Sequence, residues 1–224
     1  MPQTRLPLYR LLFWGTVLVV LICAAVVVWP RFRLMRDIAE VRSALARGDM
    51  DAALHGVERA VTVGPNSAEA HYLLAVVARR AGRMDEFPGP LRRAAELGWS
   101  EGDVMRQQWL AAAQQGSVED VRRQLLQIVE SGCSDEEAEE VYEAFTKGYL
   151  RTYRLPDAWL SVSYWLEWRP DAVQARIMRA RIYEQQGKRE EGMDDYRAVL
   201  RVFPNHREAR VRLAQSLVVR ERND

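Results

Sequence analysis

One position recurs along the chain at a fixed spacing, and this spacing constrains the fold more than any other feature. In chain order it is occupied by Gly48, Gly82, Gly116, Tyr153 and Gly187. The step is 34 residues, except for one step of 37 between the third and fourth copies. A proline follows 17 residues later in three copies, at Pro65, Pro170 and Pro204. Because a glycine inside a helix costs about 1 kcal/mol relative to alanine, the pattern predicts pairs of helices that turn at the repeated position.

Small and apolar residues keep step with the repeated position on both sides. Five residues after it stand Ala53, Phe87, Val121, Ala158 and Gly192, and the residues nine and twelve after it are also small or apolar. These three offsets lie on one face of a helix with 3.6 residues per turn. Four residues before it stand Ala44, Ala78, Ala112, Tyr149 and Tyr183. Each copy is therefore predicted to be two helices that pack through these faces.

The pattern resembles the tetratricopeptide repeat in its period, in the Gly-Asp of "ARGDMDAAL", in the small residues at the helix crossing and in the closing "VFPN". The resemblance implies an all-α solenoid of five helix-turn-helix repeats, with a capping helix over residues 207–222. The expected repeats are 34–67, 68–101, 102–135, 139–172 and 173–206. As a domain, the solenoid with its capping helix is assigned to residues 37–222.

Three departures from the repeat predict a less regular middle. The second repeat carries "FPGP", so its second helix is expected to start late, near Pro88 or Pro90. The second and third repeats have Trp99 and Cys133 in place of the closing proline. Three extra residues near 136–138 are expected to lengthen the turn between the third and fourth repeats.

The run "LLFWGTVLVVLICAAVVVW" covers residues 11–29 without a charge. As a helix it would reach about 28 Å, close to the thickness of the hydrocarbon core of a bilayer. We predict a short tail over 1–10, a transmembrane helix over 11–30 that ends at Pro30, and a basic linker over 31–36. A cleaved signal peptide is the alternative, with "CAA" at 23–25 as its cleavage site. Arginines flank both ends of the run, so the positive-inside rule does not orient the body.

Composition and motifs argue against several function classes. Five of the 32 lysines and arginines precede Asp37, whereas all 31 acidic residues stand at or after it. The body is therefore mildly acidic, which argues against binding nucleic acid. The chain lacks the P-loop, HExxH, Gly-x-Ser-x-Gly and dinucleotide motifs, and its two cysteines and three histidines form no metal-ligand pattern. We expect no catalytic, cofactor or metal site, and an enzyme is the least supported reading.

The resemblance also implies a binding groove, which in this family is lined mainly by the first helix of each repeat. The family's groove positions fall on Arg42, Tyr72, Val76, Arg79, Arg80, Arg106, Leu110, Lys147, Arg151 and Arg181. Arginine recognises carboxylates with two parallel hydrogen bonds, so an acidic and apolar peptide segment is the implied ligand. A solvated helix face is the alternative. The asparagine of the family's carboxylate clamps is absent, because Arg42, Val76 and Leu110 stand at the matching positions.

The stretch "AWLSVSYWLEW", residues 158–168, is rich in aromatic residues. Trp165 falls on the buried offset, but Trp159, Tyr164 and Trp168 cannot all share its face. One or two of these three are candidates for an exposed patch that contacts a partner or a membrane surface. Packing in the core is the alternative.

The sequence thus predicts a membrane-anchored scaffold for protein–protein interactions. This plan is similar to that of membrane-anchored assembly factors and auxiliary subunits of bacterial translocation machinery, which implies the bacterial inner membrane without fixing the side of the body. A self-associating structural membrane protein, a homo-oligomer held through the fourth repeat, is the alternative.

Overall fold

The computed structural model describes residues 8–221, without the side chains of residues 8–12, 15, 18–24, 26–27 and 220–221. Within this part the chain forms eleven helices: α1 (Leu8–Ala46), α2 (Met50–Val63), α3 (Ala68–Arg80), α4 (Pro88–Glu96), α5 (Glu101–Gln114), α6 (Val118–Glu130), α7 (Asp135–Arg151), α8 (Leu155–Trp168), α9 (Val173–Gln185), α10 (Arg189–Val202) and α11 (Arg207–Glu221). The predicted all-α array of helical hairpins is confirmed, because each repeat holds one odd-numbered and one even-numbered helix.

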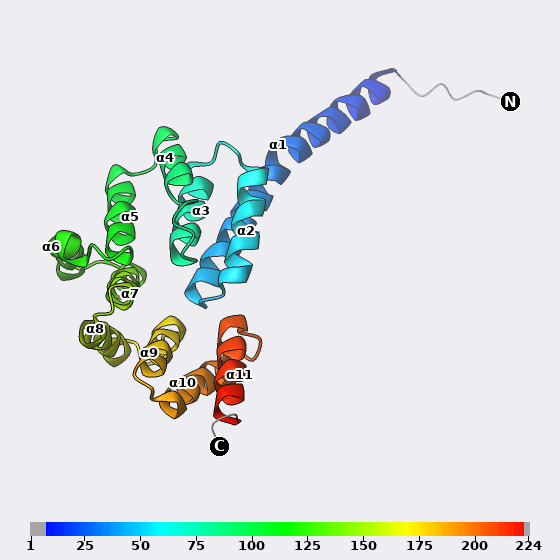
Figure 1. Cartoon of the computed structure of the whole chain (residues 1–224). Coiled ribbons are helices and arrows are strands. Elements are labelled where there is room, and N and C mark those ends of the chain that lie inside the picture. The colour runs from blue at the N-terminus through cyan, green and yellow to red at the C-terminus, as the bar shows by residue number, and fades with distance from the viewer. Residues whose placement is uncertain (1–7, 222–224) are drawn as a thin grey trace.

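The array bends round on itself, so that α11 returns to the turn between α1 and α2 (Figure 1). Arg207 at the start of α11 forms an ion pair with Asp51 of α2 at 3.3 Å. A side chain added at Gly48 would contact Val173 of α9. The first repeat therefore approaches the last repeat and the capping helix, and the array curves around an inner surface.

The repeated position is the point where each hairpin reverses. Gly48, Gly82, Gly116 and Gly187 all have positive φ, between 71° and 108°. Tyr153 has φ 56° and is the one non-glycine residue with positive φ in the described part of the chain. Left-handed backbone ends helices readily at glycine but costs a residue with a side chain roughly 1–2 kcal/mol. The fourth repeat therefore keeps the turn of the others at an energetic cost.

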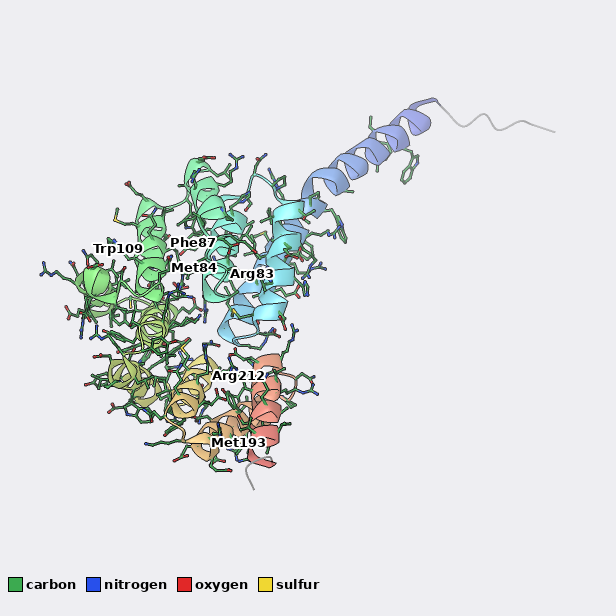
Figure 2. The ribbon with its side chains drawn as sticks, in the orientation of Figure 1. Arg83, Met84, Phe87, Trp109, Met193 and Arg212 are labelled. Atoms are coloured by element: carbon green, nitrogen blue, oxygen red, sulfur yellow. The ribbon has the colours of Figure 1, made fainter. Side chains whose placement is uncertain are left out.

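The predicted helix faces form the core. Ala53, Ala158, Leu125 and Trp165 are completely buried, and Phe87, labelled in Figure 2, is also buried. Glycine replaces a larger residue where helices approach closely. A Cβ at Gly148 of α7 would clash with the backbone carbonyl oxygen of Ala113 in α5. The backbones of α5 and α7 therefore pack closer than side chains would allow.

The late start of the second repeat's second helix is confirmed, because α4 begins at Pro88. The expected longer turn before the fourth repeat is wrong. The three extra residues instead extend α7, which begins 18 residues before Tyr153, whereas α3 begins 14 before Gly82. Ser134 and Glu137 form a reciprocal capping box at its start, and its first turn holds Asp135, Glu136 and Glu137. Both features stabilise a helix N-terminus.

The prediction that Pro30 ends a helix is wrong, because α1 continues through it to Ala46. Residues 31–36 are therefore helix and not a linker. Proline costs about 3 kcal/mol inside a helix, but Leu34 packs against the core and Ile38 and Val41 are buried in it, which holds the following turns helical. Among the described residues, no helix is both long and apolar enough to cross a bilayer. Most side chains of the run predicted as transmembrane, residues 11–29, lie outside the described set.

Candidate protein-binding site

Among the cavities on the inner surface of the array, two are opposite in charge. The acidic cavity, of about 320 Å³, lies between α3, α5 and the start of α7. Its charged lining consists of three arginines and five carboxylates: Arg42, Arg80, Arg106, Asp103, Glu136, Glu137, Glu139 and Glu140. The apolar part of its wall includes Tyr72, which stacks on Trp99 with ring centroids 4.8 Å apart.

The basic cavity, of about 510 Å³, lies between the end of α7, α9 and the first repeat. Its charged lining consists of five cations and two carboxylates: Arg80, Arg83, Lys147, Arg151, Arg181, Asp51 and Glu208. Three glutamines add neutral hydrogen-bonding groups: Gln114, Gln174 and Gln185.

A buried layer of charges separates the two cavities. Arg79 of α3 is completely buried and donates from Nε to Oε1 of Gln107 at 2.8 Å. Its Nη2 lies 3.2 Å from Oε1 of Glu140. Gln114 donates to the backbone oxygen of Arg79 at 2.8 Å. This layer links α3 to α5 and α7 through polar contacts, so Arg79 serves the packing of the array.

Glu143 is the central carboxylate of this layer. Nε of Arg80 lies 2.8 Å from its Oε2, and Nζ of Lys147 donates to its Oε1 at 2.6 Å. Burial opposes ionisation of Glu143, but the charges of Arg80, Lys147 and Arg79 outweigh burial and lower its pKa to about 2. Lys147 also donates to the backbone oxygen of Arg80 at 2.7 Å. An unpaired charge buried at this place would cost several kcal/mol of desolvation energy, on the order of the general value for one ion. The two cations and Glu143 therefore stabilise one another.

The sequence of α7 produces both cavities. Its first half, "DEEAEEVYE", carries the carboxylates, and its last turns carry Lys147 and Arg151. Acidic residues at a helix N-terminus and basic residues at its C-terminus both interact favourably with the helix dipole. Because α7 crosses the inner surface, its charge polarity gives one cavity an excess of carboxylates and the other an excess of cations.

The structure divides the predicted groove residues into three sets. Arg42, Tyr72, Val76 and Arg106 line the acidic cavity. Lys147, Arg151 and Arg181 line the basic cavity, and Arg80 borders both. Placing Arg79 and Leu110 on the groove surface is wrong, because both side chains are completely buried and line neither cavity.

Most of the predicted cations already have partners inside the protein. Arg42 donates to Glu69 at 2.6 Å, and Arg106 pairs with Asp103 and Glu137. Arg106 also donates to the hydroxyl of Tyr72 at 3.2 Å. Arg151 and Arg181 differ, because no described residue forms an ion pair or hydrogen bond with either side chain. These two are the cations of the predicted set that remain available to a ligand.

Sequence reasoning missed the neutralising role of Glu139 and Glu140 and the buried Gln107. The run "DEEAEE" indicates only a favourable helix N-terminus when considered alone. The spacing of Glu136, Glu140 and Glu143 places them on one helix face, and that spacing was the available signal. It does not reveal which arginines of other repeats the face would meet.

The three aromatic residues predicted as a contact patch, Trp159, Tyr164 and Trp168, lie in two different environments. Trp159 is half-buried, packs against the core and contacts Tyr183 edge-on, with ring centroids 5.2 Å apart. Tyr164 and Trp168 are 53% and 40% exposed. These two share a groove on the outer side of the array, between α6 and α8. In the described part of the chain, no group of histidine, cysteine and carboxylate side chains could hold a metal ion.

Two stretches match tetratricopeptide-repeat family profiles, residues 38–101 and residues 173–216. No curated protein matches the chain. Solved structures that resemble it include three at 17% identity. The tetratricopeptide-repeat domain of P58(IPK) is covered over 54% of its length by 82% of this chain, with a TM-score of 0.36. YrrB, described as having an unusual peptide-binding site, is covered over 88% by 77% of this chain, with a TM-score of 0.39. The pilF protein of Pseudomonas aeruginosa is covered over 92% of its length by 86% of this chain, with a TM-score of 0.42.

This chain thus spans about half the length of the P58(IPK) chain that it resembles. The family matches fall at the two ends of the array, on α1 to α4 and on α9 to α11. The helices between them continue the same alternation of hairpins. The two family matches identify residues 38–101 and residues 173–216 as tetratricopeptide repeats, and proteins built from such repeats are typically scaffolds that bind protein or peptide partners and are not enzymes.

Proposed function

We propose that this protein is a membrane-anchored scaffold whose basic cavity binds an acidic segment of a partner protein. The observation that carries the ligand class is the pair Arg151 and Arg181. They line a cavity in which five cations face two carboxylates, and neither has a partner among the described residues. Guanidinium groups bind carboxylates through two parallel, charge-assisted hydrogen bonds. The apolar residues Met50, Leu54 and Leu150 in the same wall suit a segment that alternates acidic and apolar residues.

The acidic cavity does not support the same ligand. Its cations are paired within the protein, and its carboxylates outnumber them. A carboxylate of a ligand would be repelled by the carboxylates of this cavity. The proposal therefore restricts the ligand site to one half of the groove that the sequence predicts.

Binding can be measured with a fluorescein-labelled peptide of alternating glutamate and leucine. We expect the double variant Arg151→Glu with Arg181→Glu to weaken binding at least tenfold, because each lost charge-assisted contact is worth about 1.5–3 kcal/mol. The control is Arg123→Glu, the same type of substitution at one site on the exposed surface of α6. A peptide with lysine in place of glutamate should not bind. Equal affinity of the double variant and the unchanged protein would refute the assignment.

The membrane anchor rests on α1. In Figure 1 its first half projects away from the array. The described side chains there include Phe13, Trp14, Val28 and Trp29, each at least 61% exposed. Large apolar side chains on a projecting helix need an apolar environment, and tryptophans near both ends of the apolar run suit the bilayer interfaces. An anchor would also raise the effective concentration of the basic cavity near membrane-bound partners.

Alkaline extraction of membranes tests the anchor. The full-length chain should remain with the membrane, and a variant lacking residues 1–30 should not. Recovery of the full-length chain in the soluble fraction would contradict the anchor, and loss of the N-terminus in the intact mass would favour the signal-peptide alternative. In a Cys23→Ser variant, Cys133 is the remaining cysteine. Its labelling by an impermeant maleimide in intact cells, compared with lysed cells, would report the side of the body.

A further inference from the structure

A groove on the outer side of the array carries a second inference, independent of the basic cavity. It has a volume of about 490 Å³ and lies between the end of α6 and the second half of α8, with α7 as its floor. Figure 1 shows α6 and α8 on the outside of the array, with α7 further in. We call it the outer groove. Its volume is in the range of ligand pockets, about 300–1,000 Å³.

The irregular step of the repeat builds this groove. The three extra residues lengthen α7 at its start, where Asp135 and Ala138 line the groove. The small side chain of Ala138 leaves the floor open, and Tyr142, one turn further along α7, limits it. Val129 and Cys133 form the wall on the side of α6. The extra turn thus lies at the one junction between repeats where the period is broken.

The other wall is aromatic and remains exposed. Tyr164 and Trp168 project from the same helix as the fully buried Trp165. Trp168 approaches Tyr142 with ring centroids 6.3 Å apart and planes inclined by 41°. The guanidinium of Arg169 lies 5.8 Å from the Trp168 ring centroid and pairs with Glu139 at 3.4 Å. These contacts hold the Trp168 ring from one side and leave the groove open between the rings.

Hydrogen-bonding capacity and charge define what would fit. The hydroxyls of Tyr142 and Tyr164 donate to no described residue, so both can donate to a ligand. The charged residues of the lining, Asp135 and Glu167, are both acidic. Asp135 pairs with Arg169 at 3.7 Å, whereas Glu167 forms no ion pair with a described residue. A polyproline II segment has a fully solvated backbone with free carbonyl acceptors, and such segments dock in grooves lined by aromatic side chains. The unpaired carboxylate of Glu167 favours lysine or arginine beside the prolines and disfavours an acidic segment.

We infer that the outer groove binds a proline-rich, basic segment of a partner protein in the polyproline II conformation. Its ligand is thus opposite in charge to the ligand of the basic cavity. The chain's own residues 1–10 contain Pro2, Pro7 and two arginines. If residues 11–29 span the membrane, this tail lies on the opposite side from the groove, which leaves a partner protein as the occupant.

The test uses the full-length chain and a fluorescein-labelled hexaproline peptide with a lysine at each end. The control peptide has glycine and serine in place of the prolines. Tyr164→Ala and Trp168→Ala should each weaken binding at least tenfold, and Glu167→Lys should weaken it several-fold with a reduced dependence on salt. The matched control is Leu160→Ala, which removes another exposed apolar side chain of α8 outside the groove. It should bind the peptide as the unchanged protein does.

Cys133 supplies a second readout, since it is a half-buried free thiol in the groove wall. Bound peptide should slow its alkylation at least fivefold, and the glycine–serine peptide should not. Equal binding of the two peptides, no binding at millimolar peptide, or unchanged affinity of Tyr164→Ala and Trp168→Ala would overturn the inference. Protection of Cys133 that rises with protein concentration without peptide would also overturn it, because a second copy would then cover the groove. The glutamate–leucine peptide should bind all these variants normally, which separates this test from that of the basic cavity.

Discussion

The two inner cavities share a wall and differ in what their charges do. Both include Arg80, and both are bordered by α7. In the acidic cavity every lining arginine pairs with a carboxylate of the protein, so its charges hold repeats together. In the basic cavity Arg151 and Arg181 have no such partner in the described structure. A groove cation is therefore a candidate for ligand binding only when the neighbouring repeats leave it unpaired.

The largest expected effect comes from removing the carboxylate between the cavities. Glu143→Gln leaves Arg80 and Lys147 buried without their shared counter-charge. Breaking a buried ion pair in this way typically costs about 3–5 kcal/mol. The free energy of unfolding in urea should fall by that amount. Glu136→Gln, an exposed carboxylate of the acidic cavity, is the control and should change it by less than about 0.5 kcal/mol. Similar values for the two variants would show that the charge layer does not hold the array.

Low pH should lower the free energy of unfolding through protonation of Glu143. The pKa of Glu143 is lowered to about 2 in the folded protein, from an ordinary value of 4.5. A lowered carboxylate pKa gives stability that is complete above the unfolded-state pKa and is lost as pH falls toward the folded-state pKa. The free energy of unfolding should therefore decrease between about pH 5 and pH 2. Glu143→Gln should flatten this decrease, and an equally steep profile in that variant would assign it to other carboxylates.

The close crossing of α5 and α7 sets the distance across the wall that the cavities share. Gly148→Ala would place a methyl group against the carbonyl oxygen of Ala113. Overpacking at such a contact costs about 1–3 kcal/mol, so the melting temperature should drop. Gly132→Ala has open space around the added methyl but a φ of 86°, and it isolates backbone strain from steric clash. If Gly148→Ala lost no more stability than this control, the crossing would have to be looser than described.

The smallest expected effect is a gain at the basic end of α7. Tyr153 is 83% exposed and has the positive φ that glycine adopts in the other repeats. Tyr153→Gly should stabilise the protein by about 1 kcal/mol through relief of backbone strain. Gly82→Ala reverses this change at the same repeated position, with nothing within 4 Å of the added methyl, and should destabilise. Thermal unfolding of both variants would show whether the effects have opposite signs.

Regular features of the fold could be predicted because they depend on local physics. The repeated glycine, the small residues at fixed offsets and the Pro-containing start of α4 each act within one hairpin. The predictions at Pro30 and near residues 136–138 failed because neighbouring packing and helix capping decided both. Buried Leu110 and Arg79 occupy groove positions of the family, but the actual contacts between repeats place them in the interior.

The sequence by itself determined the period, the helical hairpins and the charge polarity of α7, because helix formation and capping depend on residues close together in the chain. Tertiary structure decided which cations are neutralised. Arg79 meets Glu140, Arg80 meets Glu143, and Lys147 reaches the backbone of Arg80 across 67 residues. Such pairings depend on how tightly the array bends, and that curvature is the sum of small rotations between repeats. No local pattern records that sum, so the separation into an acidic and a basic cavity appears only in the folded array.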